Sequence, residues 1–440
     1  MRNSFLAALL TGTVLALGHA APAHSVELNL IRFFGDCANE YGNVTELDKA
    51  VGECGIIQVL TNKFNAENDL GATVNTQTVD WGTYYDQLSA TYSTGSIPDI
   101  AVMHRSVLPN FTTRNLVEPL AEGFAEVGVD TKDFAPAALE AVTVGETVYG
   151  LPFDLHALLF HINMDLMEQA GLVQNGQPVL PSSPEELLQH AKQMKERTGK
   201  NYFAMESGAS EFMPVRLFNT WVWQQGQDVI AADGSAANLD SDAGRAAAEL
   251  LATLYSEGHI NSRHDYAAAE QAFLAGDVAI LINGTWVVDS YSTQAEGGEA
   301  GLKNYRVANL PNLFSQDAVW SDSHLWVMPV DQSRSDEEQK AALAFLAFLN
   351  EHNYDWARTG HLAVRTSVLE SEQFNALPQR SNYAETSQIA RALPAIPGQR
   401  AIQDIMVSEL SSIWLAGKSV DDVLPSMQRR VEQTLRRSQR

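Results

Sequence analysis

Cysteine and long apolar runs are both scarce in this 440-residue sequence. The two cysteines, Cys37 and Cys54, are too few for a structural zinc site and have no nearby histidines at ligand spacing. Beyond the first residues, no stretch reaches the roughly 18 apolar residues that a membrane-spanning helix needs. The sequence therefore predicts neither a cysteine-rich zinc protein nor a membrane-spanning one.

Positive charge is also in short supply. Lys and Arg number 29 against 54 Asp and Glu, which gives a formal net charge of −25. Such a surface repels nucleic acid and anionic bilayers, so neither is expected as a partner. The length and the 45% hydrophobic content predict two or more globular domains.

The N-terminal residues have the pattern of a secretory signal. Arg2 precedes an apolar run from Phe5 to Leu17, and Ala21–Ala23 fits the small-x-small cleavage pattern. We expect cleavage after about Ala23, which makes residues 1–23 the signal peptide. No cysteine stands at this site to accept a lipid, so the expected location is the bacterial periplasm without a lipid anchor.

The exported part contains both cysteines. An oxidising compartment favours a disulfide between Cys37 and Cys54, and in the chain-entropy account a loop of this size contributes about 3 kcal/mol. The alternative is a pair of free, buried thiols.

Strand and helix patterns alternate after the signal. Residues 26–34, 72–81 and 97–104 have strand character, and residues 55–68 and 83–95 have helical spacing between them. This alternation predicts a parallel sheet in an α/β lobe.

Helix-capping signals mark further helices. Ser183 and Glu186 form a capping-box pattern before a helix that Gly199 should end, and Ser335 with Glu338 repeats the pattern. There is no internal repeat and no low-complexity linker. Extended strands are therefore the expected connection between domains.

The stretch "YGLPFDLHALLFHIN" combines an apolar strand with two neighbouring polar side chains. Leu151, Phe153 and Leu155 alternate on one face, and Asp154 and His156 share the other. That polar face either meets solvent or lines a cleft that holds a polar ligand.

Several stretches, in this order, resemble one protein family. They are Pro98-Asp99-Ile100, Tyr149–Pro152 with its following strand to Asn163, "AFLAGDVAILINGTW", "AALAFLAFL" and "IWLAGKSVDDVLPSMQRRVEQTL". Together they are similar to the extracellular solute-binding proteins of ABC importers, in the sugar-binding group that includes the maltodextrin-binding proteins.

This resemblance implies an α/β fold of the periplasmic-binding-protein kind, type II-like, with a ligand cleft between two lobes joined by crossing strands. The domains expected on this basis are residues 1–23 for the signal, 24–154 plus about 325–355 for lobe one, and 155–324 plus about 356–440 for lobe two. Asp154 and His156 then face the cleft on the first crossing, and Asp322 and His324 on the return.

The function implied by the resemblance is that of a periplasmic binding component, not an enzyme. It would capture a sugar, oligosaccharide or polyol by lobe closure and deliver it to an inner-membrane ABC permease. A monomer without cofactor or metal is expected. The alternatives are a secreted glycoside hydrolase, a binding protein for an anionic sugar derivative, and a receptor that feeds a sensor. The sequence contains no His-Glu-x-x-His and no Gly-x-Ser-x-Gly motif.

Sugar sites need aromatic faces beside carboxylates, amides, Arg or His. Trp286 follows a buried strand at a turn, where the resemblance places a stacking tryptophan. Trp81 ends a strand at the expected cleft edge, and Trp223 is a further candidate. For each of these rings, packing in a core is the alternative.

Polar candidates follow the first and third strands. The resemblance places a ligand carboxylate at Asp36. Tyr41 joins it if the disulfide loop covers the cleft, and otherwise belongs to a surface loop. His104 and Arg105 follow the third strand, with structural or solvent-facing roles as alternatives. Arg365 is also a candidate, although Ala363 and Val364 stand where family members often have proline.

Overall fold

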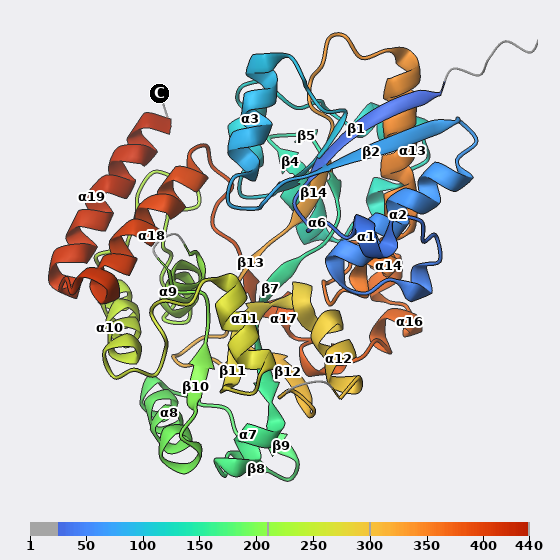
Figure 1. Ribbon diagram of the computed structural model, residues 1–440. Helices are drawn as coiled ribbons and strands as arrows, with labels where there is room; N and C mark the ends of the chain where they lie inside the picture. Colours follow the sequence, from blue (N-terminus) through green and yellow to red (C-terminus); the bar gives the residue numbers. More distant parts are fainter. Residues whose placement is uncertain (1–24, 209–210, 299–300, 439–440) are drawn as a thin grey trace, which may run out of the picture.

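The computed structural model describes residues 25–208, 211–298 and 301–438. It has two α/β lobes, each built around its own sheet, and Figure 1 shows one above the other. The predicted signal peptide, residues 1–23, lies outside the described residues. Across the three described ranges, no helix has the length and the apolar character needed to cross a bilayer.

The sheet of the first lobe has five strands. In spatial order they are β2 (Ala72–Thr78), β1 (Val26–Arg32), β3 (Ile100–His104), β14 (His324–Val327) and β6 (Leu151–Pro152). The first three pair in parallel, as the alternation of strands and helices predicts. Strands β14 and β6 come from distant parts of the chain and add antiparallel pairs at the other edge.

Helices cover this sheet and bury its apolar side chains. They are α1 (Ala38–Tyr41), α2 (Gly52–Glu67), α3 (Tyr84–Thr94), α4 (Leu108–Thr112), α5 (Ala121–Glu126), α6 (Pro136–Val142), α13 (Asp336–Glu351) and α14 (Asn353–Ala357), with short 3-10 turns η1 (Leu47–Lys49) and η2 (Thr131–Asp133) and a hairpin of β4 (Thr143–Val144) and β5 (Thr147–Val148). Leu60, Leu88 and Leu346 from three of these helices share one core with the strands.

The sheet of the second lobe is of mixed direction. Its strands are β10 (Asn201–Ala204), β11 (Val278–Gly284), β7 (His156–Asn163), β13 (Val319–Asp322) and β15 (Ala390–Arg391), with β12 (Tyr305–Asn309) also paired to β7. Every residue of β7 is buried, because this strand pairs antiparallel with β11, β12 and β13 at the centre of the lobe.

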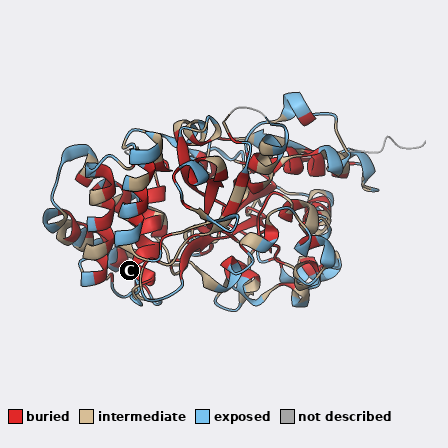
Figure 2. Ribbon diagram, turned by 90° about the horizontal axis from the view of Figure 1, so that it is seen from below, coloured by how far each residue is buried: buried red, intermediate tan, exposed pale blue. Residues whose placement is uncertain are grey.

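Two apolar cores fill the second lobe, and buried residues follow its strands and inner helix faces in Figure 2. Its other elements are α7 (Met164–Gln169), β8 (Val173–Gln174), β9 (Gln177–Pro178), α8 (Pro184–Thr198), α9 (Met213–Trp223), α10 (Asp242–Ser256), α11 (Tyr266–Leu274), η3 (Thr285–Val287), α12 (Val288–Glu296), α15 (Thr366–Leu369), α16 (Glu372–Asn375), η4 (Arg380–Asn382), α17 (Thr386–Ile389), α18 (Gln399–Ala416) and α19 (Val420–Ser438).

The capping signals read from the sequence set the starts of two helices. Ser183 caps α8 and Gly199 ends it in a left-handed conformation. The Glu186 carboxylate accepts from the backbone N–H and hydroxyl of Ser182. In the expected capping box it would accept from the backbone N–H of Ser183, so this part of the box involves the preceding residue. In α13, the full capping box of Ser335 and Glu338 is present.

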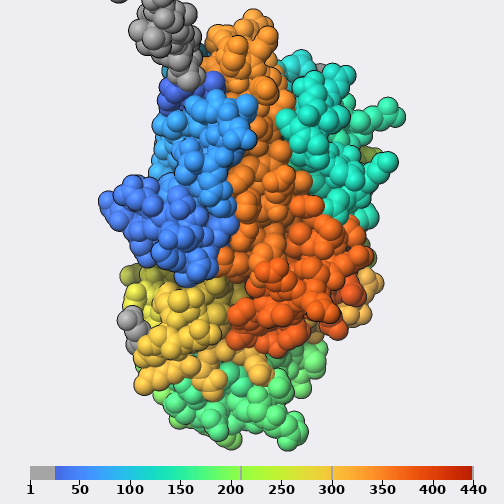
Figure 3. Space-filling view, turned by 90° about the vertical axis from the view of Figure 1, so that its right-hand side faces the viewer, coloured from blue at the N-terminus to red at the C-terminus, as the bar shows by residue number. Residues whose placement is uncertain are grey.

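The chain passes between the sheets in short extended segments. It leaves the first sheet at Pro152 and joins the second at His156, then returns between Asp322 and His324. After α14 the chain approaches the first crossing again, where Leu362 forms a β-bridge with Leu155. Figure 3 shows this orange-red part covering the junction of the lobes. Because the chain passes from one sheet to the other at these points, we propose that the two lobes have the residue ranges expected from the sequence.

A disulfide ties the loop after β1 to the start of α2. The Cα atoms of Cys37 and Cys54 lie 5.9 Å apart across the bond. The predicted pairing is confirmed, and the alternative of two free thiols is excluded.

Candidate functional site

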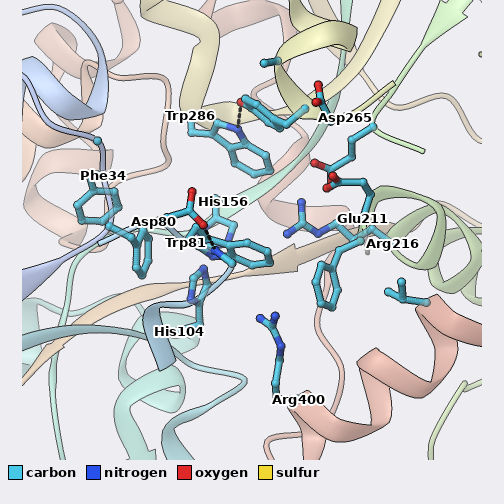
Figure 4. Close-up of a pocket in the computed structure, with 18 of the residues that line it drawn as sticks. Phe34, Asp80, Trp81, His104, His156, Glu211, Arg216, Asp265, Trp286 and Arg400 are labelled. Carbon is cyan, nitrogen blue, oxygen red and sulfur yellow. Dashed lines mark hydrogen bonds between the residues drawn. The ribbon is translucent and has the colours of Figure 1, made fainter. Parts of the chain in front are cut away.

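A cavity of about 870 Å³ lies between the two lobes. Its size falls within the range of about 300–1,000 Å³ that is usual for small-molecule sites. Both lobes contribute to it, as Figure 4 shows for several of its side chains. The lining residues are Phe33, Phe34, Gly35, Glu53, Asp80, Trp81, Gly82, His104, His156, Glu206, Glu211, Phe212, Arg216, Asp265, Tyr266, Ala267, Trp286, His324, Arg400, Asp404, Val407 and Ser408.

Two tryptophans form aromatic walls of the cavity. Trp81 follows β2 in the first lobe, and its ring meets Phe212 of the second lobe edge-on, with centroids 5.2 Å apart. Trp286 lies in η3 after β11, where its Nε1–H donates to the Tyr266 hydroxyl at 3.1 Å. Both tryptophans are only partly buried, so their rings offer apolar faces to a ligand.

Arg216 is an unpaired cation among the tryptophans. Its guanidinium carbon lies 4.4 Å from the Trp320 ring centroid, 5.7 Å from that of Trp286 and 6.0 Å from that of Trp81. Its buried Nε atom has no hydrogen-bond partner, and Arg216 has no ion pair with any described residue. Burial lowers its pKa. Its N–H donors are therefore available to a ligand.

Carboxylates surround this arginine. Glu206 accepts the backbone N–H of Met213 at 3.1 Å, at the N-terminus of α9. Burial and repulsion from Glu206 raise the pKa of Glu211 to about 7. Near neutral pH the Glu211 carboxyl can therefore both donate and accept hydrogen bonds.

Arg400 enters the cavity from α18, at the lower edge of Figure 4. Its guanidinium carbon lies 5.0 Å from the Trp81 ring centroid and 4.4 Å from that of Phe212. Unlike Arg216 it has a carboxylate partner, since its Nε–H donates to Asp404 at 3.2 Å. Arg400 thus contacts both rings of the Trp81–Phe212 pair and is itself paired with Asp404.

Three histidines from three strands meet at the base of the cavity. His104 ends β3, His324 begins β14 and His156 begins β7. The register of β3 and β14 places His104 opposite His324. The ring centroid of His324 lies 4.3 Å from that of His156 and 4.7 Å from that of His104. The two crossings therefore bring residues of both lobes into direct contact.

Asp154 binds two of these histidines on the side away from the cavity and has no exposure to solvent. Its carboxylate accepts from His156 Nδ1 at 3.0 Å, from His324 Nδ1 at 2.8 Å and from Trp356 Nε1 at 2.7 Å. Burial opposes ionisation of Asp154, but His324, His361 and these hydrogen bonds together hold its pKa well below the usual range. Asp154 is thus a buried anion shared by both crossings.

The three histidines differ in the balance between burial, which lowers the pKa, and the neighbouring negative charge, which raises it. Burial lowers the pKa of His104 well below its usual value and that of His156 to about 3, so both rings are neutral at pH 7. Burial also opposes protonation of His324, but the negative charge of Asp154 outweighs it and raises the pKa of His324. Of the three cavity histidines, His324 is therefore the one whose surroundings favour the protonated form.

Part of the candidate set from the sequence lies on the cavity wall. These residues are Trp81, His104, His156, Trp286 and His324. Trp81 and Trp286 follow β2 and β11, His104 ends β3, and His156 and His324 begin β7 and β14. Position beside a strand and the resemblance to the sugar-binding group together pointed to these residues. Their contact with a ligand stays a prediction.

Three candidates of the first lobe lie outside the lining. Asp36 is exposed, and only its neighbour at position 35 reaches the cavity. Tyr41 is buried in the lobe-one core. Arg105 turns away, because its guanidinium pairs with Glu140 at 2.9 Å and donates to the Leu393 carbonyl at 3.2 Å. The geometry gives no support to a ligand contact by any of them.

Four further candidates also lie outside the lining. Asp154 is beneath the histidines, and Asp322 is buried while accepting backbone N–H groups of two serines. Trp223 is helical rather than extended and packs in the lobe-two core. Arg365 pairs with Asp133 at 2.7 Å. For these residues the structure shows structural roles in place of the expected exposure to the cleft.

Sequence reasoning missed most of the lobe-two polar wall. Glu206, Glu211, Arg216 and Arg400 come from α9, its preceding loop and α18. One signal was present for Arg216, which is the only charged residue in the apolar helix "MPVRLFNTWVW". The others lie in polar stretches without a distinguishing pattern.

Comparison with known proteins identifies the family. Residues 60–382 match the family described as bacterial extracellular solute-binding protein. A protein of Brucella abortus that is named only as a binding protein is 25% identical over 95% of both chains. The sn-glycerol-3-phosphate-binding periplasmic protein UgpB of Escherichia coli K12 is 24% identical over 97% of both chains.

Solved structures show the same fold. The GacH receptor of Streptomyces glaucescens has a TM-score of 0.78 at 17% identity, covering 94% of this chain and 99% of that one. Maltose-bound MalE3 of T. maritima has a TM-score of 0.77 at 17% identity, covering 93% and 100%. The expected two-lobed α/β fold is confirmed. The chain therefore belongs to the bacterial extracellular solute-binding protein family, and it is a binding protein and not an enzyme.

Proposed function

We propose that this protein captures a sugar, oligosaccharide or polyol in the periplasm and delivers it to an inner-membrane ABC permease. The observation that carries this proposal is the composition of the interlobe cavity. Aromatic faces of Trp81 and Trp286 stand beside the free donors of Arg216 and several carboxylates. Sugars combine apolar C–H faces with hydroxyl groups that both donate and accept, so this wall suits them.

Within this class, the charge of the lining favours a neutral solute. The carboxylates on the cavity wall outnumber the arginines, Arg216 and Arg400, and Arg400 already has a partner. The carboxylates are Glu53, Asp80, Glu206, Glu211, Asp265 and Asp404. They repel an anion but accept hydrogen bonds from hydroxyl groups.

An anionic sugar derivative is the second candidate, favoured by the unpaired guanidinium of Arg216. An arginine without a carboxylate partner is well suited to a phosphate or carboxylate group. A curated relative at 24% identity is named for binding sn-glycerol 3-phosphate. A similar structure, UgpB of Mycobacterium tuberculosis, contains glycerophosphocholine, with a TM-score of 0.73 at 18% identity, covering 94% of this chain and 100% of that one.

Lobe closure around the solute is part of this proposal. Contacts across the cleft support it, because they would break when the lobes open. The Gly398 N–H donates to the Asn110 side chain at 2.6 Å, and Trp81 meets Phe212 across the cavity. The chain crossings between the two sheets are short, which suits a hinge.

The experiment is a thermal-shift screen of the mature protein. The panel contains monosaccharides, maltooligosaccharides, polyols, sn-glycerol 3-phosphate and glycerophosphocholine. A solute at 100 times its dissociation constant adds about 2.7 kcal/mol of stability. Stabilisation by neutral carbohydrates supports the first candidate, stabilisation only by the phosphorylated compounds supports the second, and no stabilisation by any of them contradicts both.

A further inference from the structure

The histidine cluster has the arrangement of a metal site. One ring nitrogen from each of His104, His156 and His324 lies within 4.8 Å of the other two. All three residues are buried, and each of them lines the interlobe cavity. They come from three different strands, so the sheets fix their positions.

The Nδ1 atom of each ring is already held by a partner. His156 and His324 each place Nδ1 against one oxygen of Asp154, at 3.0 and 2.8 Å. His104 places Nδ1 at 2.6 Å from the Tyr85 hydroxyl. That hydroxyl accepts the backbone N–H of His104, and its contact with Nδ1 holds the ring whichever of the two atoms carries the shared proton. The nitrogen that remains on each ring is Nε2, and where it carries a proton, as in the charged form of His324, binding of an ion releases that proton.

The Nε2 atoms of these three rings have no hydrogen-bond partner among the described residues. His361 provides a contrast within the same cluster, because its Nδ1 meets Thr285 at 3.0 Å and its Nε2 meets Glu53 at 2.8 Å. A histidine with a purely structural role is satisfied in this way. In the three cavity histidines Nε2 has no such contact, so it is the ring nitrogen left for a ligand in the cavity.

We propose that His104, His156 and His324 bind a divalent transition-metal ion of the Zn²⁺ class through their Nε2 atoms. Three imidazoles suit zinc, copper and nickel, and do not suit magnesium or calcium, which prefer oxygen. In such sites a carboxylate or other acceptor usually holds the second nitrogen of each ligating histidine, and Asp154 and Tyr85 do so here.

The site needs only a small contraction to close on an ion. Tetrahedral zinc with Zn–N bonds of about 2.0–2.1 Å requires ligand nitrogens about 3.3 Å apart. The nearest ring nitrogens, within 4.8 Å of one another, therefore have to approach by about 1.5 Å at most. The buried anion Asp154 compensates part of the added positive charge.

The remaining coordination position faces the cavity. Water fills it in the absence of a solute, as in metal sites with three protein ligands. A solute oxygen would take the same position on closure, and this second step rests on the proposed carbohydrate function. Binding of the ion itself does not depend on it, so the two proposals can fail separately.

The test uses mature protein stripped with a chelator and titrated with zinc chloride, without any solute. We expect one ion per chain, with at least 100-fold weaker binding in His104→Gln and in His324→Gln. His259→Gln is the matched control, because His259 contacts Glu257, the residue after α10, away from the cavity. Its zinc binding should equal that of the wild type. Equal zinc affinity in all four proteins would overturn the proposal.

A second measurement avoids any dependence on how well the variants fold. X-ray absorption at the zinc edge of the loaded wild type should show three nitrogen neighbours of imidazole type at about 2.0 Å. If most neighbours of the zinc ion are oxygen atoms, or if a brief buffer wash removes the ion, the proposed histidine site is wrong. The carbohydrate screen is unaffected by either result.

Discussion

The Nδ1 atom of His324 lies 2.8 Å from Oδ2 of Asp154, at a place where the chain crosses twice between the lobes. The two residues are 170 positions apart, and neither side chain has significant exposure. Each of the two residues favours the charged form of the other. The pKa of His324 is therefore raised and that of Asp154 lowered, as expected for a buried ion pair at the crossing.

Replacement of Asp154 by Asn should destabilise the protein strongly. The change removes the buried charge that favours the protonated form of His324 and one of the two oxygens that accept from His156, His324 and Trp356. Breaking one partner of such a buried pair costs about 3–5 kcal/mol. Urea unfolding at pH 7 measures the loss. Asp277→Asn removes an exposed pair with Lys200 and serves as the control, with an expected loss of at most about 1 kcal/mol. Equal stabilities of the two variants would contradict the assigned role of Asp154.

Replacement of Trp286 by Ala should weaken solute binding about 30- to 150-fold. Loss of a stacking face and its buried area corresponds to about 2–3 kcal/mol. Isothermal titration with the best solute of the screen measures the change. Trp223→Phe is the control, because Trp223 packs in the lobe-two core outside the cavity. Unchanged affinity in a folded Trp286→Ala variant would remove this ring from the site.

The sequence predicted those parts of the site that lie next to strand ends. Trp286, His104 and His324 all stand directly beside apolar strands, and the order of strands already indicated an α/β lobe. The antiparallel addition of β14 to β3 could not be read from local patterns, since its pairs are more than 200 residues apart.

Local sequence patterns could not predict which polar side chains of the second lobe line the cavity. Arg216 approaches Trp81 only because α9 and the loop after β2 meet across the cavity, and nothing in either segment specifies that approach. The same holds for Asp154, whose position facing the cleft was expected from the family resemblance. The hydrogen bond from Trp356, 202 residues away, helps to place it beneath the surface.

Replacement of Arg216 by Met should separate the two candidate solutes. If the solute is neutral, as proposed first, loss of a charged hydrogen-bond donor costs about 1.5–3 kcal/mol, or about 10- to 150-fold in affinity, and binding changes little with salt. Arg391→Met, which removes a pair with Asp228 and a contact with Trp223 outside the cavity, should leave affinity unchanged. Wild-type affinity that falls steeply with ionic strength would favour the anionic candidate.

The raised pKa of Glu211 predicts a pH-dependent effect of Glu206. The folded pKa of about 7 exceeds the ordinary 4.5, so the native state holds this proton more tightly. Its stabilising contribution is present below pH 4.5 and is lost as the pH rises to 7. Glu206→Gln removes the repulsion, so it should raise stability over the wild type at pH 8 and much less at pH 4.5.

Urea unfolding at the two pH values checks this expectation. Glu185→Gln is the control, because Glu185 lies in the first turn of α8 and outside the cavity lining. It should show no comparable difference between pH 8 and pH 4.5. An equal effect of Glu206→Gln at both values would contradict the coupling of the two carboxyl groups.

Solution scattering with and without a saturating solute from the screen tests the central claim most directly, namely that the two lobes close around one captured molecule. The account predicts a smaller radius of gyration and maximum dimension when a neutral carbohydrate or polyol is bound. Scattering curves that coincide at saturation, with binding verified in the same sample, would contradict capture by lobe closure.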